Sequence, residues 1–182
     1  MEKQNSCGIW NKNRECLVPT SKLILLPCYH REVIPESYLD AMGHMNVRWY
    51  MALFDTSVWN LFISKGLDET YFKKRKMGVF ALKHIVQYFS EVTAGEKVCM
   101  HIRMLGRNET RFHFMNFMIN ETSGKLAATL EVMGTPADLT LRKAVAMPQD
   151  IRQKFDTQIE KDRHLGWEAP ISGVIKLGSS PN

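Results

Sequence analysis

The most continuous hydrophobic pattern in the sequence lies between residues 40 and 64. It opens with a polar turn that contains glycine. Apolar residues then recur every three or four positions, the spacing of one helical face. These residues are Val47, Tyr50, Met51, Phe54, Val58, Leu61 and Phe62. Because the opposite side also carries two tryptophans, we expect other elements to wrap this helix on every side. Asn46 is its predicted N-cap, and Gly66 is predicted to end it.

After Gly78 the period changes from helical spacing to alternation, which predicts β-strands. The predicted strands are residues 79–92, 98–104, 112–118 and 126–137. Because short polar turns separate them, we expect an antiparallel meander in which each strand pairs with the next. One face of the first of these strands is predicted to carry Phe80, Leu82, His84, Val86 and Tyr88.

Weaker patterns flank these elements. Residues 23–33 predict another strand, in which Pro27 indicates an edge position or a bulge. Residues 66–78 are basic and predict an exposed loop or short helix. Residues 149–160 predict an amphipathic helix, and the stretch after residue 165 is rich in Gly, Ser and Pro and is expected to be a tail.

The order of elements therefore predicts an α+β protein in which an antiparallel sheet curls around one long apolar helix. We expect the second face of that sheet to meet a second subunit. The domain is assigned to residues 21–148. An irregular N-terminal arm of residues 1–20 precedes it, and a C-terminal short helix and tail of residues 149–182 follow it.

Composition narrows the class of protein. The 182 residues are 45% hydrophobic and 24% charged, which is ordinary for a globular chain. No apolar run is long enough to span a membrane, and the N-terminus lacks the apolar core of a secretory signal, so we expect a cytoplasmic protein. The net charge of +5 is scattered except at residues 73–76, so no nucleic-acid partner is expected.

The cysteines are Cys7, Cys16, Cys28 and Cys99. They form no C-x-x-C pair, so we expect reduced thiols, with a Cys7–Cys16 disulfide as the alternative. The cysteines and the six histidines show no familiar metal-ligand spacing, so no metal site is expected.

The turn before the long helix carries a family resemblance. Its sequence DAMGHMN, from Asp40 to Asn46 and followed by Tyr50, resembles the D-x-x-G-H-x-N-x-x-x-Y turn of hotdog-fold acyl-CoA thioesterases, in the 4-hydroxybenzoyl-CoA thioesterase-like branch. The resemblance covers about residues 22–148. Segments at 84–96, 105–113 and 127–131 are similar to thioesterases of carnitine breakdown, which cleave betainyl-CoA.

This resemblance implies a hotdog fold and the hydrolysis of an acyl-CoA, such as a short betainyl-like one, to a free acid and CoA. It implies no cofactor beyond the CoA of the substrate, and a homodimer or a dimer of dimers. Two other functions stay open. One is an enoyl-CoA hydratase or dehydratase, although the turn lacks the proline usual in those enzymes. The other is a non-catalytic acyl-CoA binding or sensor module.

The resemblance assigns catalysis to Asp40, as nucleophile or as the base that aligns water. A thioester carbonyl needs an attacking oxygen and donors for the developing oxyanion, and the free N–H groups at the start of a buried helix are such donors. Gly43 would let the backbone approach the substrate. His44, the second catalytic candidate, could donate to the carbonyl, line the acyl pocket or cap the turn.

The remaining candidates would bind substrate. Asn46, Tyr50, His84, Gln87 and Tyr88 are candidates for the acyl pocket, with helix capping or core packing as the alternatives. His84 lies on a strand expected to approach the helix of a partner subunit. A trimethylammonium group could be held by cation–π contacts with Trp49, Tyr50 or Tyr88. The candidates for the CoA phosphates are Arg107, Arg111, Arg142 and Lys143.

Overall fold

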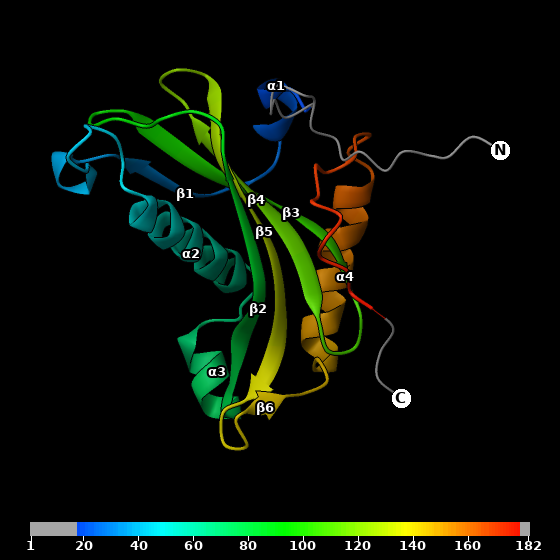
Figure 1. Ribbon diagram of the computed structural model, residues 1–182. Helices are drawn as coiled ribbons and strands as arrows, with labels where there is room; N and C mark the ends of the chain where they lie inside the picture. Colours follow the sequence, from blue (N-terminus) through cyan, green and yellow to red (C-terminus); the bar gives the residue numbers. More distant parts are fainter. Residues whose placement is uncertain (1–17, 179–182) are drawn as a thin grey trace.

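The computed structural model describes residues 18–178, which contain one strongly curled antiparallel sheet (Figure 1). Its strands are β1 (Cys28–Val33), β2 (Met77–Tyr88), β3 (Lys97–Arg107), β4 (Phe112–Asn120), β5 (Lys125–Asp138) and β6 (Lys143–Ala144). In this part of the chain the strand order is β1-β3-β4-β5-β2, and β6 pairs with β5. The α+β class is confirmed.

The expected meander is only partly correct, because β2 pairs with β5 and not with β3. Residues 89–96 do not form a tight hairpin. They cross from the β2 edge of the sheet to the opposite edge, next to β1. There Ile34 N–H donates to the Glu96 carbonyl oxygen, and Gly95 N–H donates to the Ile34 carbonyl oxygen. The connection also contacts the segment before the long helix, since Met45 N–H donates to the Val92 carbonyl oxygen over 2.8 Å.

The helices are α1 (Thr20–Leu23), a 3-10 turn η1 (Glu36–Tyr38), α2 (Val47–Ser64), α3 (Glu69–Arg75) and α4 (Gln149–Arg163). Both predicted ends of α2 are confirmed. The Asn46 side chain accepts a hydrogen bond from Arg48 N–H, and Gly66 follows the helix with φ +69°, a conformation that favours glycine. In residues 18–178 no helix is long and apolar enough to cross a membrane.

The inner face of the sheet packs against α2 (Figure 1). Alternate residues of β3 and β4 point to this side, as predicted, and Phe114 and Met118 meet Phe54 and Leu61 of the helix in one buried cluster. Burying each such side chain contributes about 1.5–3 kcal/mol, so this cluster is the main source of stability.

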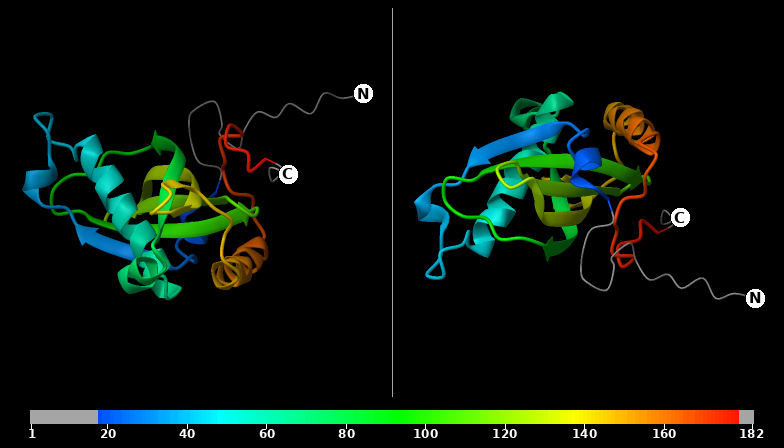
Figure 2. Two further views of the ribbon diagram at one scale, coloured as in Figure 1. Left: turned by 90° about the horizontal axis from the view of Figure 1, so that it is seen from below. Right: turned by 90° about the horizontal axis from the view of Figure 1, so that it is seen from above.

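The outer face of the sheet is covered by the same chain, so the expectation of a second subunit there is wrong. Met115 and Phe117 of β4 pack with Leu23 of α1 and with Trp167 and Ala169. The C-terminal residues expected to be a tail thus belong to the core, and Figure 2 shows this segment, coloured orange to red, passing close to α1. Apolar residues between the glycines and prolines supply the contacts.

A buried carboxylate, that of Glu131, holds the C-terminal segment on the outer face. His113 Nε2 lies 2.9 Å from Glu131 Oε1, and Ser172 N–H donates to Glu131 Oε2 over 2.7 Å. Burial alone would raise the pKa of Glu131, but these hydrogen bonds more than offset it and the pKa is lowered. The carboxylate therefore stays charged beneath the segment it holds.

The expectation that other elements wrap α2 on every side is wrong for the described chain. The sheet covers one side, whereas Val47, Trp59 and Ile63 remain 61%, 38% and 46% exposed. A sheet curls around only part of a helix, so the rest of an all-apolar helix needs a cover from elsewhere.

Two details of the strands differ from expectation. Residues 23–26, expected in a strand, form the end of α1 and a turn, because Pro27 stops the extended segment and β1 begins only after it. The edge position expected for this strand is confirmed. In β2 the register shifts between Ala81 and Lys83, so Val79 packs in the core in place of Phe80.

Helix α4, predicted from its apolar spacing, extends the core at the β1 side. Since β1 pairs only with the first half of β3, α4 packs beside the second half, where Met104 N–H donates to Asp162 Oδ2 over 2.7 Å. Burial raises the pKa of Asp162. Phe155 of α4 also packs on Phe62 of α2, which joins the helices at this end.

Candidate functional site

The turn before α2 is a tight, hydrogen-bonded loop. Asp40 N–H donates to the His44 carbonyl oxygen over 2.9 Å, and Gly43 N–H donates to the Asp40 carbonyl oxygen over 3.0 Å. The Asp40 side chain accepts from Met42 N–H, also at 2.9 Å. Gly43 has φ +83°, which suits glycine best. The loop therefore holds the half-buried Asp40 carboxylate in a fixed place near the start of α2.

Neighbouring segments anchor this turn from both sides. Asn46 N–H donates to the Tyr38 carbonyl oxygen over 2.9 Å, which ties the turn to η1. His44 Nε2 lies 3.1 Å from a carboxylate oxygen of Glu91 in the β2–β3 connection. The imidazole is thus oriented by an acidic partner, in the way that catalytic and structural histidines both are.

Two aromatic pairs surround the start of α2. Trp49 stacks on Tyr38 with ring centroids 3.7 Å apart, and Tyr50 meets Tyr88 edge to face at 5.0 Å. Burial, with a smaller contribution from Tyr88, raises the pKa of Tyr50 to about 12. Tyr50 therefore stays a neutral phenol. The C-terminal end of β2 lies beside the start of α2, because Tyr88 is the last residue of that strand.

A cavity of about 310 Å³ lies between α2 and the inner face of the sheet, along the first half of β2. Its walls are mostly apolar, and the aromatic residues among them include Trp59, Phe62, Phe72, Phe112 and Phe114. Such a concave apolar pocket with few polar groups is typical of small-molecule binding sites.

The polar side chains of the cavity come from Asp55 in the middle of α2 and His84 on β2. Burial lowers the pKa of His84, and the charge of Asp55 acts in the opposite direction. Asp55 was not among the predicted site residues. The signal that could have identified it is that it is the acidic residue of α2, in the middle of a helix rich in apolar side chains.

The structure divides the predicted acyl-site residues into groups. Asp40, Gly43, His44 and Asn46 share the turn, and Tyr50 and Tyr88 meet next to it. Of the predicted residues, His84 lines the cavity. Gln87 is paired with Thr129 on β5, on the opposite face of the sheet from His84, so the structure does not bring it to the cavity.

The predicted CoA-binding residues are also divided. Arg107 forms an ion pair with Asp156 of α4, and Arg111 Nη1 donates to the Leu177 carbonyl oxygen over 3.2 Å. Both therefore have structural partners on the C-terminal side. Arg142 lies 5.8 Å from the ring of Phe80, which lines the cavity, and the adjacent Lys143 is exposed on β6.

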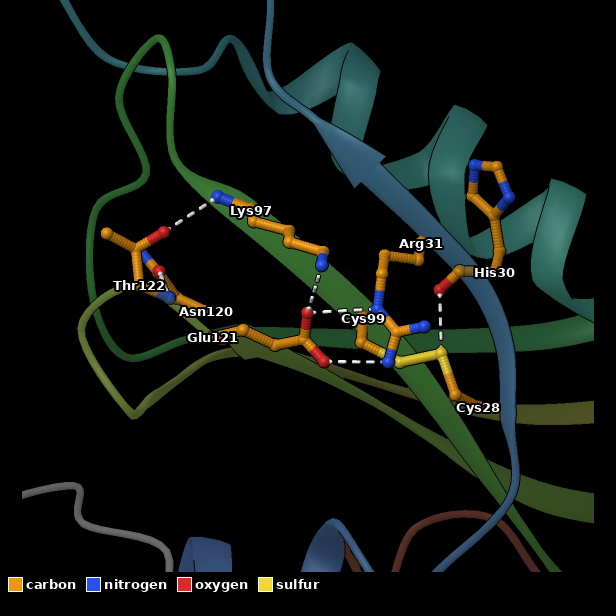
Figure 3. Close-up of polar contacts among 8 residues, drawn as sticks. All are labelled: Cys28, His30, Arg31, Lys97, Cys99, Asn120, Glu121 and Thr122. Carbon is orange, nitrogen blue, oxygen red and sulfur yellow. Dashed lines mark hydrogen bonds and ion pairs between the residues drawn. A yellow bond between two sulfur atoms is a disulfide. The ribbon is translucent and has the colours of Figure 1, made fainter.

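The expectation that all cysteines are reduced is wrong for the described residues, because Cys28 and Cys99 are joined by a disulfide (Figure 3). The two lie 71 residues apart in sequence, and only the pairing of β1 with β3 brings them together. The alternative pair, Cys7 and Cys16, lies outside residues 18–178.

The thioesterase-like superfamily model matches residues 34–155, and the chain therefore belongs to this superfamily. Over 127 residues, or 70% of the chain, it is 26% identical to the L-carnitine dehydrogenase/betainyl-CoA thioesterase of Agrobacterium fabrum. The chain spans only 26% of the length of that relative.

Solved structures agree with this assignment at the level of the fold. A Staphylococcus aureus protein solved in complex with CoA superposes with a TM-score of 0.74 at 20% identity, over 84% of this chain and 97% of that one. The 1,4-dihydroxy-2-naphthoyl-CoA thioesterase from Synechocystis superposes with a TM-score of 0.63 at 12% identity, over 70% of this chain and 93% of that one. The hotdog fold is confirmed.

Proposed function

We propose that this chain is an acyl-CoA thioesterase that hydrolyses its substrate to a free acid and CoA. The carrying observation is the turn that holds Asp40 at the start of α2, in a chain of the thioesterase-like superfamily. The name of the Agrobacterium relative contains two activities, a dehydrogenase and a thioesterase. The match to the thioesterase-like family model covers the turn, α2 and the cavity, and therefore supports the thioesterase.

The proposed site needs two copies of the chain. Asp40 does not line the cavity of its own chain. The cavity lies along the first half of β2, whereas the Asp40 turn lies near its end, beside Tyr88. If two copies pair antiparallel along β2, the end of one strand meets the beginning of the other. Asp40 of one copy then approaches the cavity of its partner.

The chemistry follows from this composite arrangement. The Asp40 carboxylate attacks the thioester carbonyl carbon, or removes a proton from a water that attacks it. Backbone N–H groups at the start of α2 stabilise the oxyanion, and each such donor typically lowers the barrier by about 3–4 kcal/mol. The C–S bond breaks and the CoA thiolate leaves. If Asp40 is the nucleophile, water then hydrolyses the acyl–aspartate anhydride.

The cavity favours a short acyl group that carries a positive charge. Trp59, Phe62 and Phe72 offer aromatic surfaces, and Asp55 offers a negative charge. This replaces the cage expected from Trp49, Tyr50 and Tyr88, because none of those three side chains lines the cavity. A betainyl-like acyl group, as in the name of the Agrobacterium relative, has this chemistry.

Arg142 and Lys143 remain the candidates for the CoA phosphates. Arg142 lies over Phe80 of the cavity wall, and within residues 18–178 neither Arg142 nor Lys143 forms an ion pair with an acidic side chain. Arg107 and Arg111 are less suited, because their guanidinium groups already hold α4 and the C-terminal segment.

The central experiment is a thiol-release assay against a panel of acyl-CoAs, with Asp40→Asn beside the wild type. We expect kcat to fall by a factor of roughly 10²–10⁴, the usual contribution of a catalytic acid–base group. The amide oxygen can still accept from Met42 N–H, so the turn should persist. Asp138→Asn is the matched control, because Asp138 accepts two backbone N–H groups in a similar turn. Full activity in Asp40→Asn would refute the assignment.

The acyl preference has its own test. Betainyl-CoA is compared with 3,3-dimethylbutanoyl-CoA, its neutral isostere in which carbon replaces nitrogen. A desolvated cation–π contact contributes about 2 kcal/mol, so kcat/KM should favour betainyl-CoA by roughly 30-fold. Asp55→Asn should reduce that preference. Equal rates for the two esters would contradict the cationic substrate while leaving thioesterase activity intact.

A further inference from the structure

On the outer face of the sheet, away from the proposed thioester site, Cys28, Cys99 and His101 lie together. Cys28 of β1 is directly opposite His101 of β3, and Cys99 precedes His101 by two residues on the same face of that strand. One ring nitrogen of His101 and the two sulfur atoms all lie within 4.8 Å of one another. Cys28 is exposed, whereas Cys99 and His101 are buried.

The imidazole of His101 is held in one orientation. Its Nδ1 lies 2.8 Å from the Leu26 carbonyl oxygen. A carbonyl only accepts hydrogen bonds, so the proton of the neutral ring is on Nδ1 and the lone pair is on Nε2. That Nε2 is buried, and within residues 18–178 it has no hydrogen-bond partner. A buried polar atom without a partner costs about 1–3 kcal/mol, which calls for an explanation.

We propose that the reduced chain binds a divalent metal ion through Cys28, Cys99 and His101, and that the ligand types favour Zn²⁺. Two thiolates and one neutral imidazole are ligands that zinc prefers, and water would complete the tetrahedron. A carbonyl that fixes the proton on the other ring nitrogen is the usual outer support of a zinc-bound histidine. The exposed Cys28 gives the ion a route to the two buried ligands.

The disulfide and the metal exclude each other, because both need the same sulfur atoms. A thiol reductant breaks the S–S bond by supplying two electrons and two protons, and two molecules of it become a disulfide. The chain then has two thiols. When Zn²⁺ binds, both thiols release their protons and the ion gains two thiolate ligands. The cluster thus has a disulfide form that excludes the ion and a dithiol form that binds it.

The charged groups around the cluster are already paired. Arg31 donates to both carboxylate oxygens of Glu121 at 2.9 and 2.8 Å, and Lys97 lies 3.7 Å from the same carboxylate (Figure 3). The Glu121 carboxylate therefore offsets one of the two positive charges near the sulfur atoms, which weakens the repulsion between these side chains and a bound metal ion.

Cobalt titration tests the proposal without relying on enzymatic activity. The full-length chain is reduced with a phosphine in the absence of oxygen and titrated with Co²⁺. We expect the absorption of thiolate-to-cobalt charge transfer to saturate at one ion per chain, and Zn²⁺ to abolish it. The disulfide form should show no such band. A reduced chain that gives no thiolate–cobalt band overturns the proposal.

Variants identify the ligands. Cys28→Ser and His101→Gln should each weaken Co²⁺ binding at least tenfold, and Cys28 is exposed, so its replacement should leave the fold intact. The matched control is the double variant Cys7→Ser/Cys16→Ser, which keeps the proposed site and should bind like the wild type. Wild-type binding by Cys28→Ser and His101→Gln, or loss of binding in the control, would contradict the assignment.

Discussion

The two outer strands of the sheet, β1 and β2, are built in different ways. β1 has six residues, lies between Pro27 and Pro35, contains a bulge and carries charged side chains. Its own chain fastens it, through the disulfide to β3 and the Arg31–Glu121 ion pair. β2 has twelve residues and leaves Leu82 46% exposed. Within the described residues, β5 is the strand that pairs with it.

Natural proteins protect a free sheet edge with short strands, bulges, prolines and charges, as β1 does. A long edge with exposed apolar side chains is suited to pairing with another chain. The exposed Trp59 and Ile63 of α2 add to the apolar surface on the side of the helix that the sheet leaves open. The proposed catalytic site therefore lies along β2, the open edge of the sheet. The proposed metal site lies at β1, the closed edge.

The largest predicted effect concerns the open edge. Leu82→Glu should disrupt the proposed pairing of two copies, because each leucine buried there would contribute about 1.5–3 kcal/mol and a two-fold interface would contain two of them. The dissociation constant should rise by roughly 10²–10⁴, as measured by analytical ultracentrifugation, and thioesterase activity should fall with it. Val33→Glu on β1, where Val33 is 56% exposed, is the control. Equal effects of the two substitutions would show that the edges do not differ.

A smaller effect is expected inside the cavity. A Cβ atom at Gly134 would lie 2.4 Å from the ring of Phe112, so Gly134→Ala must push that ring aside. Overpacking of this kind costs about 1–3 kcal/mol, and the displaced ring should also obstruct the cavity. Denaturant unfolding measures the first effect and KM the second. Gly106→Ala is the control, because a Cβ atom there meets only the end of the Leu177 side chain, at 3.2 Å. Gly124→Ala is not suitable as a control, because its φ of +70° would strain an alanine.

At the closed edge a still smaller effect is expected from the surface ion pair. Glu121→Gln should lower the free energy of unfolding by no more than about 1 kcal/mol, because exposed ion pairs contribute little. Denaturant unfolding at low and high salt tests this, and salt should reduce the difference. A loss several times larger would mean that the ion pair, and not the disulfide, is the main fastening of β1.

The smallest effect is a shift in a titration curve. Burial lowers the pKa of His84 from 6.5, so the folded chain disfavours the imidazolium form. The stability that this contributes is present above pH 6.5 and is lost as the pH falls through the folded value. Asp55 opposes the shift, so Asp55→Asn should lower the pKa of His84 further, as measured by NMR. Asp156→Asn, away from the cavity, should leave it unchanged. An unchanged His84 curve in Asp55→Asn would mean that the Asp55 carboxylate does not affect the pKa of His84.

Much of the fold was predictable because it depends on local patterns. The period of apolar residues predicted α2, the strands β3 to β5 and helix α4, and the residue types Asn46 and Gly66 predicted the ends of α2. The turn from Asp40 to Asn46, which resembles that of hotdog-fold thioesterases, could be identified because its residues are adjacent in sequence. The order of strands was less predictable, because the segment after β2 resembles a hairpin turn although it crosses the sheet.

The sequence by itself determined the α+β class, the long apolar helix and the turn that carries Asp40, since each depends on residues close together in the chain. Only the tertiary structure decided that β2 pairs with β5 and forms the second edge, that Asp55 and His84 share a cavity, and that Cys28 and Cys99 meet. These pairings join residues far apart in sequence, and they form only when strand register and helix packing bring the segments together in space.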